Sequence, residues 1–266
     1  MIDRLDVRIL YVATVTIDHT WTSRDVCSSF WRMYLNDRHG ASVLTNAGPY
    51  HITPDRVHFV PAWVTFTCRN ATPVRNSYVH FDLIGLASPV VRRVFPQPSC
   101  ANGRAAALRR RADALFPSDN PIDQPARLCE IKSMVLAELA RLFRSLPQPS
   151  QAALSHSLAA QSSFNALTEY IETHLAAPLD NADLARRSGL SESHFTRCFH
   201  AELGMSPARY VRERRVAAAA QRLAFSNDPI DLIAETTGFA NRFHFSRIFR
   251  QLMGVPPAAY RRQQIV

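Results

Sequence analysis

The sequence predicts an α+β protein of two domains: an N-terminal β-barrel or sandwich with packed helices, and a C-terminal all-helical domain with two helix-turn-helix motifs. Residues 8–86 form short runs rich in β-branched and aromatic residues, separated by turn residues. A helix-turn-helix pattern occurs twice after residue 178. Between these parts, residues 147–162 combine Pro, Ser, Gln and Ala without a large apolar face, as linkers do. We therefore expect domains at residues 1–146 and 163–266.

Strands are expected within residues 8–17, 29–36, 40–71 and 76–86, with turns at Gly40, Gly48-Pro49, Pro54-Asp55 and Pro61. A basic helix is predicted over residues 103–116. Its run Arg109, Arg110 and Arg111 could bind phosphate, but a charge run on a helix is more often a solvated face.

A second helix is predicted over residues 125–146, where apolar residues recur every three or four positions. The stripe consists of Leu128, Ile131, Val135, Leu139, Leu142 and Leu146. Two arrangements satisfy this pattern. The stripe packs on the barrel, or it pairs with its copy in a homodimer as coiled-coil helices do.

Residues 229–262 carry the pattern of helix, turn, helix and stop. Ile230, Ile233 and Ala234 recur at helical spacing, and Gly238 follows where the chain must leave the helix with a positive φ. Asn241 can cap the next helix, whose buried face is formed by Phe245, Ile248, Phe249 and Leu252. The other face carries basic, hydrogen-bonding and aromatic groups and no acid: Arg242, Phe243, His244, Ser246, Arg247 and Arg250. Such a face suits the major groove of DNA.

Residues 179–210 repeat this design, with Ser191 as the candidate cap. Five residues of the first copy stand 50 positions before identical residues of the second: Phe195, Arg197, Phe199, Gly204 and Pro207 before Phe245, Arg247, Phe249, Gly254 and Pro257. An internal repeat of fixed period indicates repeated structure. A long helix is predicted over residues 206–225 between the copies, and a shorter one over 164–175 before them. A rigid connector can hold two reading helices about 34 Å apart, one turn of B-DNA.

The paired motifs resemble the DNA-binding domain of the AraC/XylS transcription regulators over residues 163–262, most closely in GFANRFHFSRIFRQLMGVPPAAYR. One departure is Ala240, where the family often has a small polar residue. The resemblance implies promoter DNA as partner, contact with RNA polymerase, and activation of transcription rather than repression. It also implies that residues 1–146 form a cupin-like barrel that binds a small-molecule effector and forms homodimers.

Helical geometry and the resemblance together nominate the residues that meet DNA. With Phe195, Phe199, Phe245 and Phe249 inward, the outward positions that match the family's base-contacting ones are Ser193, Thr196, Arg197, Phe243, His244 and Arg247. Arg197 and Arg247 suit bidentate contact with guanine, worth roughly 1–3 kcal/mol each. Each could instead bind phosphate or form an internal ion pair. Phosphate contacts are expected from Ser191, Asn241, Arg242 and Arg250.

Aromatic and polar residues that could line the barrel are Trp31, Tyr34, Tyr50, His51, Trp63, Tyr78 and His80. Core packing is the alternative for each of them. No metal site is expected, because the histidines of this region lack an HxH pair with a nearby Glu. No cofactor is predicted, and the five scattered cysteines indicate neither a disulfide framework nor a zinc site.

The net charge of +9 favours polyanions, although it does not concentrate in the second domain. Residues 160–266 hold 13 arginines against 10 acidic residues, whereas residues 1–159 hold 18 basic against 12 acidic. With 47% hydrophobic residues, no secretory leader and no apolar run of membrane-spanning length, the sequence predicts a cytoplasmic protein that has no membrane partner.

The sequence therefore predicts a DNA-binding regulator rather than an enzyme. One alternative is an effector-independent DNA binder whose barrel only dimerises. Another is a DNA-repair methyl-acceptor fusion, which needs a reactive, metal-bound cysteine. No CxxC, GxSxG, P-loop or HExxH element supports an enzyme.

Overall fold

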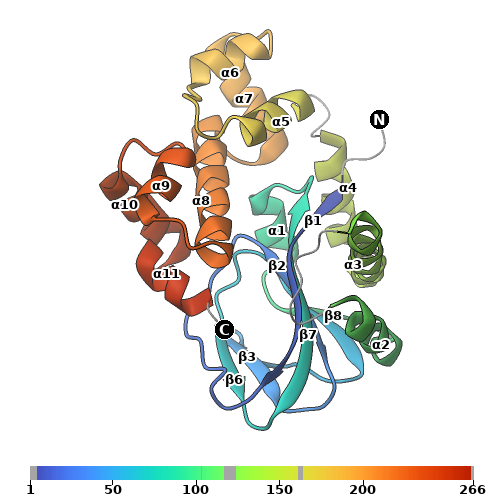
Figure 1. The fold of residues 1–266 in the computed structure, drawn as a ribbon. Coiled ribbons are helices and arrows are strands. Elements are labelled where there is room, and N and C mark those ends of the chain that lie inside the picture. Colours follow the sequence, from blue (N-terminus) through green and yellow to red (C-terminus); the bar gives the residue numbers. More distant parts are fainter. Residues whose placement is uncertain (1–4, 103, 117–123, 161–163, 265–266) are drawn as a thin grey trace. The chain divides into compact units, whose positions relative to one another are not determined.

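The computed structural model describes residues 5–102, 104–116, 124–160 and 164–264 (Figure 1). The chain forms two compact units, one from Met1–Ile84 and Val94–Gln151 and the other from Gly85–Arg93 and Ala152–Ile265. The first unit holds all the described strands, and the second is helical. The predicted α+β class is confirmed.

The first unit contains two antiparallel sheets. The larger has the order β1-β7-β2-β5-β8, from β1 (Asp6–Ile17), β7 (Val74–Ile84), β2 (Trp31–Asn36), β5 (Arg56–Val60) and β8 (Ser99–Asn102). The smaller has the order β4-β3-β6, from β4 (Gly48–His51), β3 (Ala41–Thr45) and β6 (Thr67–Asn70). The two sheets share a core of apolar side chains that includes Tyr34, Val74 and Tyr78 from the larger and Val43 and Cys68 from the smaller.

The predicted barrel is not closed. A closed barrel needs an unbroken ladder around the whole sheet. Here β4 and β6 are four residues long and pair only with β3 among the described strands, so the two sheets stay separate. Outside the named strands, the bridge between Val26 and Phe66 is isolated. The strands of the first unit therefore form an open sandwich of two sheets in place of the expected closed cupin-like barrel.

The strand register decides which side chains face the smaller sheet. Tyr34 lies opposite Tyr78, and Asn36 lies opposite Asn76, so all four share one face of the larger sheet. The opposite face meets helix α3 (Pro125–Ser145), which packs on β1 and β8. The stripe of α3 is buried there at Ile131, Val135, Leu139 and Leu142. Of the two arrangements open for this stripe, packing on the sheet is the one observed.

Two elements of the first half were not expected from the sequence. Helix α1 (Ser88–Val94) and strand β8 lie in the Pro-rich stretch after β7, and only α2 (Ala105–Leu115) was predicted there. Strand β8 forms because the ladder with β5 pairs its backbone groups, a long-range contact that local sequence does not reveal.

The segment predicted as a linker is also helical. Helix α4 spans Gln148–Ala160, with Leu154 and Ser157 buried. Its proline sits in the first turn, where a missing N–H is tolerated, and alanine supports the helix that follows. Residues 161 and 162 of the expected linker lie outside the described residues.

The second unit consists of α5 (Asn165–Thr173), α6 (Asn181–Arg187), α7 (Glu192–Leu203), α8 (Pro207–Phe225), α9 (Ile230–Thr236), α10 (Arg242–Met253) and α11 (Pro257–Gln264), together with most of α1 and most of α4. The predicted helices over 164–175 and 206–225 are present as α5 and α8. Across the described part of the chain, every helix is too short or too polar to span a membrane.

Candidate nucleic-acid interface

The sequence repeat is a structural repeat. In each copy a short helix, α6 or α9, ends two residues before a glycine of positive φ: Gly189 at 67° and Gly238 at 81°. The next residue closes the same turn in both copies, since Leu190 N–H donates to Ala185 O at 3.1 Å and Phe239 N–H donates to Ala234 O at 3.0 Å. Each turn leads into the longer helix, α7 or α10.

The two longer helices end alike but begin differently. Asn241 caps α10, because its Oδ1 accepts from His244 N–H at 2.8 Å, as the sequence predicted. Ser191 is the N-cap residue of α7, but its side chain makes no capping hydrogen bond. Both helices end in a left-handed glycine, Gly204 or Gly254, whose N–H lies 2.9 Å from the carbonyl oxygen four residues earlier.

Aromatic rings hold each helix in place. Phe245 packs on Phe249 with ring centroids 5.4 Å apart, and Phe249 packs on Tyr260 at 5.2 Å. In the first copy the equivalent distances are 5.4 Å for Phe195 and Phe199 and 5.6 Å for Phe199 and Tyr210. Burial of these phenylalanines turns the opposite faces of α7 and α10 to solvent.

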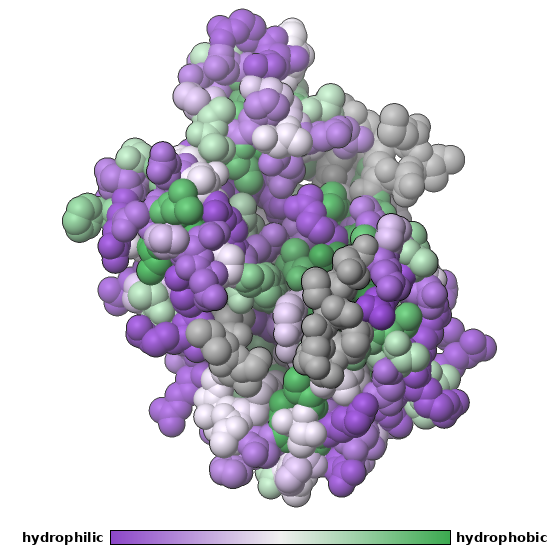
Figure 2. All heavy atoms as spheres, viewed as in Figure 1, coloured by the Kyte–Doolittle hydropathy of each residue, from purple (hydrophilic) through white to green (hydrophobic). Residues whose placement is uncertain are grey.

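The residues nominated for DNA lie on these outward faces. Ser193, Arg197, His244 and Arg247 are exposed, Thr196 is half-buried, and Phe243 is 87% exposed. Ser191, Asn241, Arg242 and Arg250, nominated for phosphate, are exposed too. Figure 2 shows mostly hydrophilic side chains on the visible surface over α6, α7, α9 and α10, interrupted by a few hydrophobic ones.

Two of these arginines already have partners on the protein. Arg197 Nη2 lies 2.8 Å from His194 Nδ1, and His194 Nε2 lies 3.4 Å from Cys198 Sγ. Arg242 Nη1 pairs with Asp231 Oδ2 at 3.2 Å. Sequence reasoning missed His194, although it stands 50 positions before His244 and the repeat contained the signal. Because His194 is exposed beside Arg197, it belongs to the same face of α7.

The residues nominated for an effector divide into two groups. Tyr34 and Tyr78 are buried in the core between the two sheets, and Tyr50 packs against it. His80 lies 4.9 Å from Tyr78, ring centroid to ring centroid. Trp31 instead lies on the other face of the larger sheet, against Phe81 and Phe95.

His51 and Trp63 are not brought into this core cluster. His51 is exposed on β4, and Trp63 is half-buried in the turn after β5, where its φ is 70° and its N–H donates to Ser28 O at 2.7 Å. The alternating pattern of a strand could have excluded Trp31, because Trp31 and Tyr34 differ by an odd number of positions.

Several polar groups in the same core were not nominated. Asn36 and Asn76 are 0% and 2% exposed, and the Nδ2 and Oδ1 of Asn36 and the Oδ1 of Asn76 have no partner within the described residues. The alternation that places Tyr34 and Tyr78 on this face also places Asn36 and Asn76 there. Unpartnered buried amides are costly, so these atoms suit a bound molecule or water.

His58 should make stability depend on pH. It is 2% exposed, with ring nitrogens 2.9 Å from the Tyr50 hydroxyl and the Thr53 amide nitrogen. Burial lowers the pKa of His58 from 6.5 to about 4. Below pH 6.5 the imidazole of His58 therefore binds a proton in the unfolded chain but stays neutral in the folded chain. The contribution of His58 to the free energy of unfolding is lost as the pH falls towards 4. From pH 7.5 to 5.0 the loss is about 2 kcal/mol.

Urea unfolding at the two pH values, followed by tryptophan fluorescence, measures this loss. The variant His58→Asn should show a smaller difference between the two pH values than the wild type, whereas the exposed His51→Asn should match the wild type. Equal pH dependence in wild type and His58→Asn would contradict the assignment. Burial also lowers the pKa of His80, which adds a loss of the same sign in every variant.

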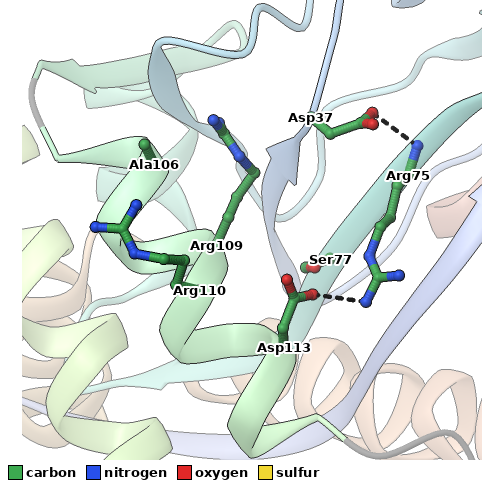
Figure 3. A pocket seen from close by; sticks show the side chains of 7 residues that line it. All are labelled: Asp37, Arg75, Ser77, Ala106, Arg109, Arg110 and Asp113. Carbon is green, nitrogen blue, oxygen red and sulfur yellow. Dashed lines mark hydrogen bonds and ion pairs between the residues drawn. The ribbon is translucent and has the colours of Figure 1, made fainter.

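A polar pocket of about 210 Å³ lies where α2 meets β2 and β7 (Figure 3). Its charges are largely paired: Arg75 bonds Asp113 at 2.9 Å through its side chain and Asp37 at 2.9 Å through its amide. Arg109 donates to the carbonyl oxygens of Asn36 and Pro54. The sequence analysis favoured a solvated position for Arg109. The structure differs, because the guanidinium of Arg109 connects α2 to the backbone of β2 and of the turn before β5.

Comparison with known proteins supports the reading of this repeat. A helix-turn-helix domain model matches residues 184–263, which include α7 and α10. The multiple antibiotic resistance protein MarA of Escherichia coli is 37% identical over 78 residues, 29% of this chain and 61% of MarA. Both matches support the resemblance to the AraC/XylS family over this part of the chain. The aligned residues cover less than two thirds of the length of MarA.

Other proteins that are similar to this chain are regulators, not enzymes. The HTH-type transcriptional activator Btr of Bacillus subtilis is 30% identical over 124 residues, 41% of this chain and 23% of Btr. ToxT from Vibrio cholerae has the same fold with a TM-score of 0.54, at 11% identity and with 99% of this chain and 100% of ToxT covered. ToxT has also been solved with an unsaturated fatty acid bound.

Proposed function

We propose that this protein is a sequence-specific DNA-binding transcription regulator in which α7 and α10 each read one short site. The observation that carries this proposal is the duplication of one geometry. Each helix is fixed by buried phenylalanines and presents an arginine, Arg197 or Arg247, at the same position of its exposed face. Neighbouring arginines and the helix N-termini at Ser191 and Asn241 are suited to phosphate.

Selection of bound duplexes from a random pool tests the proposal. The wild type should enrich two short motifs about one helical turn, roughly 34 Å, apart. Arg197→Ala should relax one motif and Arg247→Ala the other, each with about a 5- to 100-fold loss of affinity for the preferred base. Retention of both motifs in both variants would contradict base reading by these arginines.

A matched control separates base reading from general charge. Arg262→Ala removes one exposed positive charge from α11, which carries none of the residues nominated for DNA, and should leave both motifs intact. If affinity instead followed salt concentration alone and no motif emerged, the protein would be a non-specific DNA binder.

We further propose that the core between the two sheets binds a small-molecule effector. Support comes from the buried Tyr34 and Tyr78 beside the unpartnered amide atoms of Asn36 and Asn76, and from the ligand that the similarly folded ToxT binds. Thermal-shift screening of the full-length protein against metabolite classes tests this. A ligand whose stabilising effect is lost in Asn76→Ala but kept in His51→Ala would support this site. An effector-independent regulator would respond to none.

Activation, contact with RNA polymerase and homodimer formation stay predictions of the family resemblance. The stripe of α3 is buried against β1 and β8, so a dimer would use another surface. Sedimentation of the free protein and of the protein bound to a selected duplex measures the number of chains per site.

A further inference from the structure

The segment Gly85–Arg93 belongs to the DNA-binding unit, although the strands before and after it in the chain belong to the first unit. The chain leaves β7 at Ile84, enters the second unit at Gly85, and returns to the first unit at Val94. Among the described residues before Ala152, no other stretch does this. The second unit is thus assembled from two separate stretches of sequence.

The segment contributes to the core around the first reading helix. Ala87 is 5% exposed and clusters with Phe164, Phe199, Leu203 and Val211, which come from the start of the unit, from α7 and from α8. Gly204, which ends α7, lies beside Pro89, since a Cβ built on Gly204 would be 3.6 Å from Pro89 Cβ. The segment therefore borders the end of α7.

A buried carboxylate fastens the segment to α8. Glu213 is 2% exposed, and its Oε2 accepts a hydrogen bond from Ser88 Oγ. Its Oε1 lies 3.7 Å from Arg92 Nη1 and 3.1 Å from Arg209 Nε. A buried carboxylate is costly unless it is paired, so Glu213 holds α1 in place through Ser88 and Arg92.

Both ends of the segment continue into well-packed parts of the first unit. At one end, β7 carries Tyr78 and His80 and stops only one residue before Gly85. At the other end, Phe95 directly follows α1 and packs on Trp31 with ring centroids 5.0 Å apart. The segment that Glu213 anchors is therefore directly continuous in the chain with β7 and with Phe95.

We propose that Gly85–Arg93 couples the first unit to the helix-turn-helix unit of α7, with Glu213 as its anchor. A change in β7 shifts the segment, and the segment acts on the end of α7. The inference rests on the proposed DNA-binding function. Coupling of this kind is reciprocal, so DNA bound by the second unit must stabilise the first unit by the same mechanism.

Tryptophan fluorescence can detect this coupling without a known effector. The three tryptophans of the chain, Trp21, Trp31 and Trp63, all belong to the first unit. Thermal unfolding of full-length protein is therefore followed by fluorescence, with and without a duplex selected for binding. The dissociation constant of each variant for the duplex is first measured by fluorescence anisotropy. The free duplex concentration is then set to the same multiple of that constant, so that the same fraction of every variant is bound.

The duplex should raise the fluorescence-detected Tm of the wild type by several degrees. The double variant Ser88→Ala/Arg92→Ala should lose roughly half of that rise or more. Arg93→Ala, an exposed arginine on the same helix, is the matched control and should keep it. Ser88→Ala alone retains the Arg92 ion pair and should give an intermediate rise, and far-UV circular dichroism verifies that each variant is folded.

The outcomes separate this inference from the function on which it rests. A duplex that binds but gives no Tm rise in the wild type, or an equal rise in the double variant, overturns the coupling and leaves DNA binding intact. A wild type that binds no duplex overturns both. A rise lost equally in Arg93→Ala would also refute the role of Glu213.

Discussion

Gly238→Ala is expected to destabilise the second unit by about 3 kcal/mol or more. Gly238 has a φ of 81°, a conformation that alanine adopts only under strain. Space is also lacking, because a Cβ there would overlap the Leu175 carbonyl oxygen and lie 2.8 Å from Arg215 Nε. That guanidinium donates to Leu175 O at 3.0 Å and to Ala177 O at 2.8 Å, so the added methyl would disturb these bonds too.

Gly189→Ala is the matched control for this substitution. Gly189 occupies the same turn of the first repeat with a φ of 67°, and a Cβ there meets nothing within 4 Å. Gly189→Ala should lower the free energy of unfolding by only about 1 kcal/mol, the cost of placing alanine at a positive φ. Urea unfolding followed by far-UV circular dichroism measures both values. Equal losses would show that close approach at Gly238 is not the source of the cost.

The two glycines also show what the sequence could and could not predict. The repeat and the positive φ at Gly238 follow from local pattern, since helical spacing and the need for glycine are written in adjacent residues. The difference between Gly238 and Gly189 is invisible in the pattern. It arises because Leu175 and Arg215, distant in sequence, close over only one of the turns.

The first unit illustrates a second limit of sequence reasoning. Strands were predicted from composition, but the separation into two sheets depends on long-range pairing. Likewise Asn36 and Asn76 were not nominated, because nothing local marks a buried asparagine as unpartnered. Their positions follow only once β2 and β7 are paired in register.

The assignment of Gly85–Arg93 to the second unit could not be predicted either. The segment reads as a connection after a strand, and Ser88 and Arg92 are ordinary surface residue types. Their partner, Glu213, lies more than a hundred residues later in the chain. By contrast, the exposed faces of α7 and α10 were predictable, because a short amphipathic helix places them by its own periodicity.

Phe249→Ala is expected to remove about 3–5 kcal/mol from the second unit. Phe249 is fully buried between Phe245 and Tyr260, whose rings lie 5.4 and 5.2 Å away, so alanine leaves a cavity lined by aromatic edges. In duplex selection with this variant, the DNA motif read by α10 should disappear, whereas the DNA motif read by α7 should still be enriched. Phe249→Leu keeps most of the volume and should cost about 1–2 kcal/mol.

Phe199→Ala tests the same argument in the first repeat. Phe199 packs on Phe195 and Tyr210 as Phe249 does on its partners, and additionally on Phe164 at 5.3 Å. The third ring adds packing contacts that alanine would lose, so we expect Phe199→Ala to cost at least as much as Phe249→Ala. The α7 motif, rather than the α10 motif, should then be lost. Loss of both motifs in either variant would mean that the two helix-turn-helix units do not fold independently around their own phenylalanines.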